Sequence, residues 1–201
     1  MNYVNYSKSI QDLIECFKKI PGVGEKSAER MALWALDCDD EFIDKFADSL
    51  INAKRNIKRC SICNNFSEEE VCNICKDTDR DSSVICVVEK PKNVVLFEKT
   101  GSYNGRYYVL DNLISNGNYN NFNIDKLIKM IDDGNANEVI LALEPNIDGE
   151  VTSLYISKLL QSKGVSISKL AHGVPLGADM DYLDLLTLET ALADRKQINN
   201  K

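Results

Sequence analysis

Two Cys-x2-Cys pairs, separated by eight residues, constrain this chain more than any other feature. The four residues are Cys60, Cys63, Cys72 and Cys75. Each pair can hold two sulfurs about 2.3 Å from one zinc ion, and four thiolates leave no coordination position for a water nucleophile. Ordinary buried thiols or two disulfides are the alternatives, but the polar stretch between the pairs does not resemble core packing. The spacing therefore predicts one structural Zn²⁺ per chain.

The other three cysteines bear on the compartment. Cys16, Cys38 and Cys86 stand singly in apolar contexts, so we predict that they are small buried hydrophobic residues. The start of the sequence does not read as a signal peptide, and there is no apolar run of about 18 residues. We therefore expect a cytoplasmic protein that does not enter a membrane.

Charge is distributed unevenly along the chain, whose net charge is −7. Residues 1–59 carry ten basic and ten acidic side chains, so the acidic excess lies entirely in residues 60–201. An acidic body repels phosphates, so any contact with nucleic acid must be local and would be strengthened by oligomerisation. The same basic side chains could equally line a solvated helix face.

Hydrophobic periodicity divides the chain into three segments. Residues 8–58 read as three helices, and the third carries an apolar stripe expected to be a core face: Phe42, Ile43, Phe46, Ala47, Leu50 and Ile51. Residues 59–76 form the cysteine loop. From residue 83, strands at 84–88, 107–110, 138–143 and 165–168 alternate with helices near 91–98, 124–132, 150–162 and 187–195. This alternation predicts an α/β fold with a mainly parallel sheet. The Asn-rich segment from Asn112 to Asn123 is expected to be an exposed, mobile loop.

The first chemical motif is IPGVGEKSA at residues 20–28, between two predicted helices. Its glycines allow a ligand close to the backbone, and the following helix begins with N–H groups that suit a phosphate. A nucleotide P-loop is excluded because Glu25 interrupts Gly-Lys-Ser and a helix precedes it. The motif resembles the hairpin of helix-hairpin-helix modules, which grip the DNA backbone without reading sequence, although a plain helix-helix turn remains an alternative. The candidate DNA contacts are Gly22, Val23, Gly24, Lys26, Arg30, Lys54, Arg55 and Lys58.

The second motif consists of acids at strand ends. Glu89 follows one predicted strand, and a segment running from Glu144 to Glu150 follows another. This resembles the Toprim fold of topoisomerases and primases, in which a Glu and an Asp-x-Asp hold magnesium. Here the second element is Glu144-x-Asn146, so a weak Mg²⁺ site at these acids is conceivable but not expected. We expect Glu89, Glu144 and Glu150 to bind a basic protein partner instead, with solvated acids as the plainer alternative.

Taken in order, these motifs resemble one family, RecR, the bacterial recombination mediator. Its most specific stretches here are residues 21–32, 60–75 and 171–177. The resemblance implies a ring-like tetramer that acts with RecO or RecF, at the nucleoid, to help load recombinase onto single-stranded DNA at gaps. It divides the chain into a helix-hairpin-helix region (1–58), a four-cysteine zinc finger (59–76), a Toprim-like domain (82–178) and a C-terminal helical segment for oligomerisation (179–201). Glu144, where the family usually has Asn, and the Asn-rich loop are departures.

No catalytic residue is predicted. His172 is the single histidine, and no Ser or Cys nucleophile has a recognisable His partner nearby. An apolar series near the C-terminus packs either on its own domain or, by the resemblance, between subunits: Tyr182, Leu185, Leu186, Leu188 and Leu192. The main alternative function is a Toprim-type nuclease dependent on a divalent metal. A structural hub that never touches DNA is a third, favoured only by the acidic charge.

Overall fold

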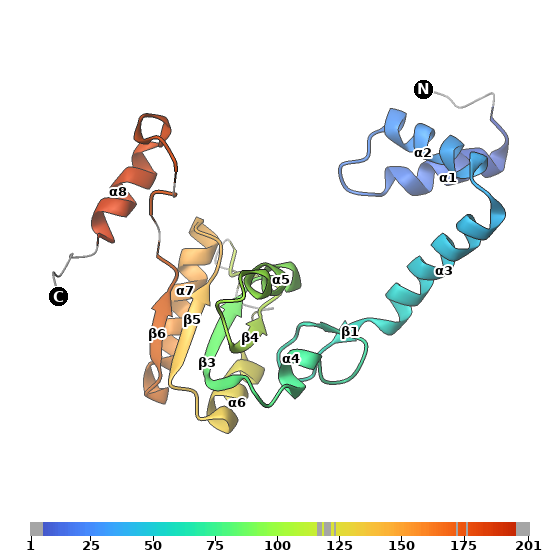
Figure 1. Cartoon of the computed structure of the whole chain (residues 1–201). Helices are drawn as coiled ribbons and strands as arrows, with labels where there is room; N and C mark the ends of the chain where they lie inside the picture. Colours follow the sequence, from blue (N-terminus) through green and yellow to red (C-terminus); the bar gives the residue numbers. More distant parts are fainter. Residues whose placement is uncertain are drawn as a thin grey trace. The chain divides into compact units, whose positions relative to one another are not determined.

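The computed structural model describes residues 6–115, 118, 122, 124–171, 173–175 and 177–195. The chain divides into two compact units, Met1–Asn56 and Ile57–Lys201 (Figure 1). His172 and part of the Asn-rich segment lie outside the described residues. Within the described part of the chain, no helix is long and apolar enough to cross a membrane.

Three helices form the first unit: α1 (Lys8–Lys18), α2 (Glu25–Asp37) and α3 (Asp40–Asn56). The turn between α1 and α2 contains Gly22 at φ +83°, a left-handed conformation that glycine adopts without steric cost. At the start of α3, the Asp39 side chain accepts a hydrogen bond of 2.8 Å from the Phe42 N–H, as an N-cap does. The three helices predicted from periodicity are therefore present.

The core of the first unit is small, and α3 contributes no buried residue to it. Ile14 of α1 packs against Ala28 and Ala32 of α2, and all three are fully buried. The apolar stripe of α3 remains accessible, with Phe42 43% and Leu50 59% exposed. The expectation that this stripe is a core face is therefore wrong for the single chain. The physical reason is that the small hairpin core of α1 and α2 does not extend to α3, which meets α2 through the exposed ring contact of Phe42 with Trp34.

The second unit begins with the cysteine loop and continues into a parallel sheet. A short antiparallel pair, β1 (Lys58–Arg59) and β2 (Phe66–Ser67), is followed by helix α4 (Asn73–Lys76). The sheet has the order β4-β3-β5-β6, with every neighbour parallel. Its strands are β3 (Asp81–Val88), β4 (Gly105–Val109), β5 (Glu138–Ala142) and β6 (Ser166–Lys169). The predicted parallel α/β architecture is confirmed.

Helices follow the strands as the alternation predicted. They are α5 (Pro91–Thr100), α6 (Asp125–Gly134), α7 (Ile147–Leu160) and α8 (Leu185–Ala193), with short 3-10 helices η1 (Gln161–Lys163) and η2 (Met180–Tyr182). Val88 of β3 is level with Val109 of β4 and Ala142 of β5. The carboxyl ends of these three strands therefore lie side by side at one edge of the sheet.

Alternate residues of β3 enter two different cores. Ile85 and Val87 join the cluster that contains α6, α7 and the four loop cysteines, whereas Cys86 and Val88 join the cluster that contains α5. Because both faces of the sheet are covered, its strands read as nearly continuous apolar runs. The cysteine loop is thus part of the larger hydrophobic core of this unit.

The edge at which β3 begins contains an irregularity. Asp81 pairs with Gly105 but Ile85 pairs with Arg106, so three residues of β3 bulge out opposite the start of β4. The Tyr103 hydroxyl spans this bulge, donating to the carbonyl oxygens of Val84 at 3.2 Å and Arg106 at 2.9 Å. A Cβ on Gly105 would lie 2.3 Å from that hydroxyl oxygen and 2.7 Å from the Val84 carbonyl oxygen. The bulge therefore requires glycine at position 105.

We predict that Gly105→Ala destabilises the second unit, because the backbone oxygen of Val84 cannot move aside as a flexible side chain would. The expected loss in the free energy of unfolding is about 1–3 kcal/mol. Gly173→Ala is the matched control, since a Cβ there would meet nothing within 4 Å. Urea unfolding followed by circular dichroism measures both variants, and equal stability of the two would show that the bulge tolerates a side chain.

Candidate metal centre and nucleic-acid interface

The four cysteines of the loop converge in the second unit. Their sulfur atoms all lie within 4.8 Å of one another, and all four residues are buried. Cys60 and Cys63 flank a tight turn in which the Asn64 N–H donates to the Cys60 carbonyl at 3.1 Å, and Asn64 has φ +63°. The Cys72 N–H lies 3.3 Å from the Cys60 sulfur and points the second pair toward the first. These four donors fit a tetrahedral zinc ion.

The surroundings of the thiols separate the ligands from Cys86. The Cys63 and Cys72 sulfurs lie 3.5 Å apart, and hydrogen bonding between them lowers the pKa of Cys72 while it raises that of Cys63, so these thiols interact directly. Cys86, by contrast, is buried in the sheet, and desolvation raises its pKa to about 12. Cys86 is therefore the inert core residue that was predicted. Cys16 is exposed and Cys38 is half-buried, so the prediction that they are buried is wrong, because Cys16 on α1 and Cys38 at the C-cap of α2 do not join the small hairpin core.

The zinc loop is fixed to the end of β4 by polar contacts that the sequence did not reveal. Asn64 donates through Nδ2 to the Val109 carbonyl at 2.9 Å and to Asp111 at 2.8 Å. The Val109 N–H donates to the Cys63 carbonyl at 2.9 Å, and Arg59 pairs with Asp111 at 2.6 Å. No local sequence signal identifies these partners, since Asn64 and Asp111 are 47 residues apart. The loop and the sheet consequently form one structural unit.

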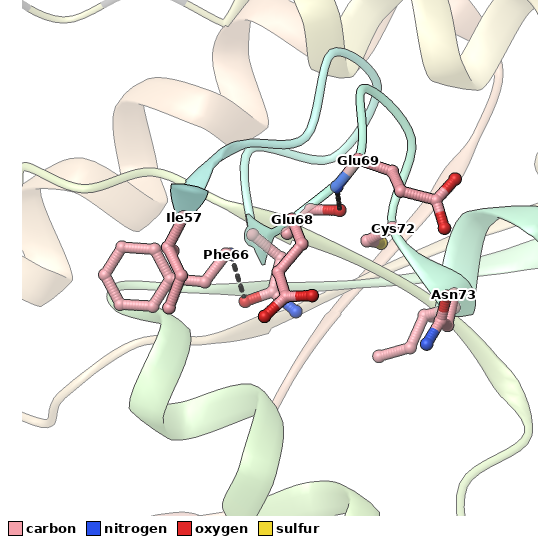
Figure 2. Close-up of a pocket in the computed structure, with 9 residues that line it drawn as sticks. Ile57, Phe66, Glu68, Glu69, Cys72 and Asn73 are labelled. Atoms are coloured by element: carbon pink, nitrogen blue, oxygen red, sulfur yellow. Dashed lines mark hydrogen bonds between the residues drawn. The ribbon is translucent and has the colours of Figure 1, made fainter. Parts of the chain in front are cut away.

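The outer side of the zinc loop carries a shallow hollow of about 350 Å³, shown in Figure 2. Ile57 and Phe66 contribute apolar side chains to its lining, and Glu68 and Glu69 contribute carboxylates that point in different directions (Figure 2). Phe66 is 55% exposed, and the Arg59 guanidinium lies 4.5 Å from the centre of its ring. The lining is thus partly apolar and partly acidic.

In the first unit, Lys26 and Arg30 lie one helical turn apart at the start of α2. Both are exposed, and no ion pair is found for either among the described residues. Arg30 borders a hollow of about 380 Å³ with Ser27, Met31 and Trp34. The first-turn N–H groups of α2 receive no side-chain cap from Gly24. This end of α2 can therefore accept an anion.

The remaining candidate DNA contacts are divided between the two units. Val23 packs on the hairpin core, and its N–H donates to the Ile20 carbonyl at 3.0 Å, so it helps to shape the turn. Lys54 and Arg55 are in the last turn of α3, whereas Lys58 is in β1 of the second unit. A single DNA-binding surface made of all eight residues stays a prediction.

The acids expected to bind a partner lie at the carboxyl edge of the sheet. Glu89 follows β3 and is only 9% exposed; its Oε1 pairs with Lys90 at 2.9 Å, whereas its buried Oε2 has no partner in the described structure. Glu144 is exposed just beyond β5. Lys90 links the two electrostatically, since its pKa is raised chiefly by the hydrogen bond to Glu89 and to a smaller extent by Glu144. Glu89 and Glu144 thus act on a common cation.

Asn146 and Glu150 have structural partners of their own. The Asn146 Oδ1 accepts a hydrogen bond of 2.8 Å from the Gly149 N–H, which makes it the N-cap of α7. Glu150 lies 3.4 Å from Lys169 of β6. Within the described part of the chain, the four cysteines are the one group of three or more potential metal ligands gathered within 4.8 Å. The carboxylates at the sheet edge do not converge to that degree.

Comparison with known protein families covers nearly the whole chain. A model of the Toprim domain matches residues 83–171, which contain all of β4, β5 and β6 and most of β3. Three models described as RecR match the remainder: the helix-hairpin-helix at residues 10–54, the four-cysteine zinc finger at 57–77 and the C-terminal segment at 173–196. The chain belongs to the RecR family. The helix-hairpin-helix, zinc-finger and Toprim expectations of the fold are thereby confirmed.

Membership of the RecR family also decides the role of the cysteines. The matched four-cysteine zinc finger includes Cys60, Cys63, Cys72 and Cys75, the same residues whose sulfurs converge. One structural zinc ion per chain is therefore the cofactor of this RecR protein. The ion would link the β1–β2 pair to α4, which begins directly after Cys72.

We predict that Cys60→Ser or Cys75→Ser abolishes zinc binding by this RecR protein. The buried thiol cluster would lose one of four ligands, and metal binding is coupled to folding, so the free energy of unfolding should fall by more than about 3 kcal/mol. Cys16→Ser is the control, because Cys16 is exposed and outside the cluster. Metal analysis should give one zinc per chain for the parent and control. A folded parent protein purified with a stoichiometry near zero would contradict the assignment.

Proposed function

We propose that this RecR protein is a non-catalytic DNA-binding scaffold for recombinational repair. In this role it acts with RecO, RecF or both to help load recombinase onto single-stranded DNA at gaps. The observation that carries the proposal is the start of α2, where the exposed cations Lys26 and Arg30 flank uncapped backbone N–H groups within a matched helix-hairpin-helix. Such a site binds phosphates of the DNA backbone and does not recognise base sequence. The protein would act at the nucleoid in the cytoplasm.

The glycines of the hairpin support a backbone contact. Gly22 needs its left-handed φ, but Gly24 has an ordinary φ of −83°, and a Cβ there would meet nothing within 4 Å. No steric contact within the described chain therefore requires glycine at position 24, although glycine caps α2 better than alanine would. A DNA strand bound close to the backbone would require glycine at this position, since a methyl group would hold the phosphates away from the α2 N–H groups.

Exposed apolar surfaces support self-association into the ring-like tetramer that the family resemblance implies. Trp34 of α2 and Phe42 of α3 have ring centres 5.9 Å apart, and Phe42 and Phe46 are stacked at 6.2 Å. All three rings are between 39% and 48% exposed. In α8, Leu185, which is 85% exposed, belongs to a helix with no buried residue. Surfaces of this kind mark protein contacts, and assembly would multiply the few phosphate contacts of one acidic chain.

The sheet edge favours a protein partner over phosphodiester cleavage. The unpartnered buried Oε2 of Glu89 and the exposed Glu144 suit a basic side chain from a partner such as RecO. The competing function is a Toprim-type nuclease, favoured by the matched Toprim domain itself. Cleavage with divalent metals needs several carboxylates on the same ions, whereas Asn146 caps α7 at the position of one expected acid.

For DNA binding, we predict that Lys26→Glu combined with Arg30→Glu lowers affinity for single-stranded DNA at least tenfold at low salt, because two phosphate contacts become repulsive. Gly24→Ala should weaken binding by a smaller factor and lower the melting temperature only slightly, since its Cβ meets no protein atom but alanine is a poorer N-cap than glycine. Lys45→Glu, on α3, is the charge control. Fluorescence anisotropy measures each affinity, and parental affinity in the double variant would place the site elsewhere.

For the sheet edge, we predict that Glu144→Ala combined with Glu150→Ala slows association with RecO or RecF about tenfold, because charge complementarity mainly governs association rates. Asp12→Ala with Asp79→Ala, two exposed acids away from the sheet edge, removes the same charge and should have little effect. Surface plasmon resonance measures the rates, with zinc content and DNA affinity expected to be unchanged. Cleavage of DNA or RNA that depends on magnesium or manganese and disappears in Glu89→Gln would instead establish the nuclease.

A further inference from the structure

A second cationic site lies in the sheet unit, at the opposite edge of the sheet from Glu89 and Glu144. It is a cleft of about 580 Å³ between the zinc loop, the start of β3 and β4, and the outer face of α6. Its cations are Arg106, Lys126 and Lys129; its other lining residues are Ser61, Ile62, Glu70, Ser82, Met130, Asp133 and Gly134. None of the family features discussed above accounts for this cluster.

The Arg106 guanidinium is the main indication that the cleft binds a ligand. Its Nε is shielded from solvent and has no hydrogen-bond partner in the described structure. Tyr107 points into the α5 core and Tyr108 into the α6 core, so by strand alternation Arg106 belongs to the α6 side. A buried donor without an acceptor is costly, and an acceptor supplied by a ligand removes that cost.

The two lysines of the cleft also lack partners within the described structure. Lys126 and Lys129 are three residues apart on α6, so they share one face, and both are exposed. No ion pair is found for them among the described residues, although Glu70 and Asp133 line the same cleft. Two neighbouring lysines repel each other, and an anion between them relieves that repulsion. The three cations outnumber the two acids.

The walls of the cleft are held in place before any ligand binds. The Ser61 N–H donates to the Glu70 carbonyl at 2.8 Å, which fixes the zinc-loop wall. The Asn137 N–H donates to the Ser83 carbonyl at 2.7 Å, which ties the β3 bulge to the segment after α6. Tyr103 holds the carbonyl of Arg106 itself. Bulges of this kind often re-aim a side chain beside a functional site.

We propose that this cleft binds a phosphate group of a single-stranded nucleic acid. Arg106 is the central donor, Lys126 and Lys129 flank the phosphate, and the hydroxyls of Ser61 and Ser82 are further donors in the lining. The fork of an arginine matches phosphate geometry, and lysines add charge at the mouth. The ligand class rests on the proposed DNA-binding function, but the site shares no residue with the hairpin. The cleft would give the acidic second unit its own contact with a nucleic acid.

The test compares full-length, zinc-loaded proteins for binding of a short single-stranded oligonucleotide over a range of salt concentrations. Lys126→Gln with Lys129→Gln should lower the affinity about tenfold and reduce the slope of log K against log salt by about 0.7, the value for one lost phosphate contact. Lys99→Gln with Lys158→Gln, on α5 and α7, is the matched control and should change neither. Arg106→Gln should give a similar loss, with zinc content and melting temperature showing that it folds.

The Lys126→Gln and Lys129→Gln changes are also introduced into the Lys26→Glu and Arg30→Glu variant, which distinguishes binding in the cleft from binding at the hairpin. The same loss in both backgrounds supports an independent cleft, whatever the hairpin variant does alone. An unchanged affinity and slope in the Lys126 and Lys129 variant overturns the proposal. Calorimetry with inorganic pyrophosphate forms the second arm. If pyrophosphate binds to the parent and not to the lysine variant while oligonucleotide binding is unaffected, the ligand is a free phosphate compound and the strand assignment is overturned.

Discussion

Convergence of four thiolates on one zinc ion is the constraint on which the second unit depends. The cysteines are not an appendage, because all four belong to the same buried cluster as Ile85 and Val87 of β3 and the helices α6 and α7. The loop that they close also supplies Asn64, which bonds to the end of β4. Zinc binding, packing of the sheet and the walls of the Arg106 cleft are therefore coupled, since Ser61 and Ile62 lie between two of the zinc ligands. Zinc binding thereby gives an acidic chain a rigid frame that holds a few cationic side chains in place, where they can attract an anionic ligand locally.

The charges of the molecule are separated by position. In the first unit, the exposed cations Lys26 and Arg30 lie at the start of α2, where we propose a phosphate contact. In the second unit, the carboxyl edge of the sheet carries Glu89 and Glu144, whereas the opposite edge carries Arg106 with the lysines of α6. All strands of a parallel sheet begin on one side and end on the other, so these two sides can present predominantly opposite charges to different partners. This separation fits a scaffold that holds a nucleic-acid strand and a protein partner together.

The sequence predicts what depends on spacing and periodicity. The cysteine pairs identify the zinc ligands, the strand-helix alternation identifies the parallel sheet, and residues 20–28 identify the hairpin turn. It fails where an outcome depends on contacts between distant segments. The α3 stripe has the period of a core face, but the first unit leaves much of it exposed, and the pattern cannot tell a core from a subunit contact. The sequence does not reveal that Asn146 caps α7 or that Asn64 bonds to Asp111. The unpartnered Nε of Arg106 is likewise apparent only in the folded chain.

We propose that zinc-loaded chains assemble into a scaffold that binds DNA without reacting with it. Native mass spectrometry with and without a single-stranded oligonucleotide measures assembly, metal content and DNA binding in one experiment. We expect a tetramer with one zinc per chain that gains the mass of intact DNA, and loses it as salt is raised. A zinc-loaded monomer that gains no DNA mass at low salt, or an oligonucleotide returned as fragments, would contradict it.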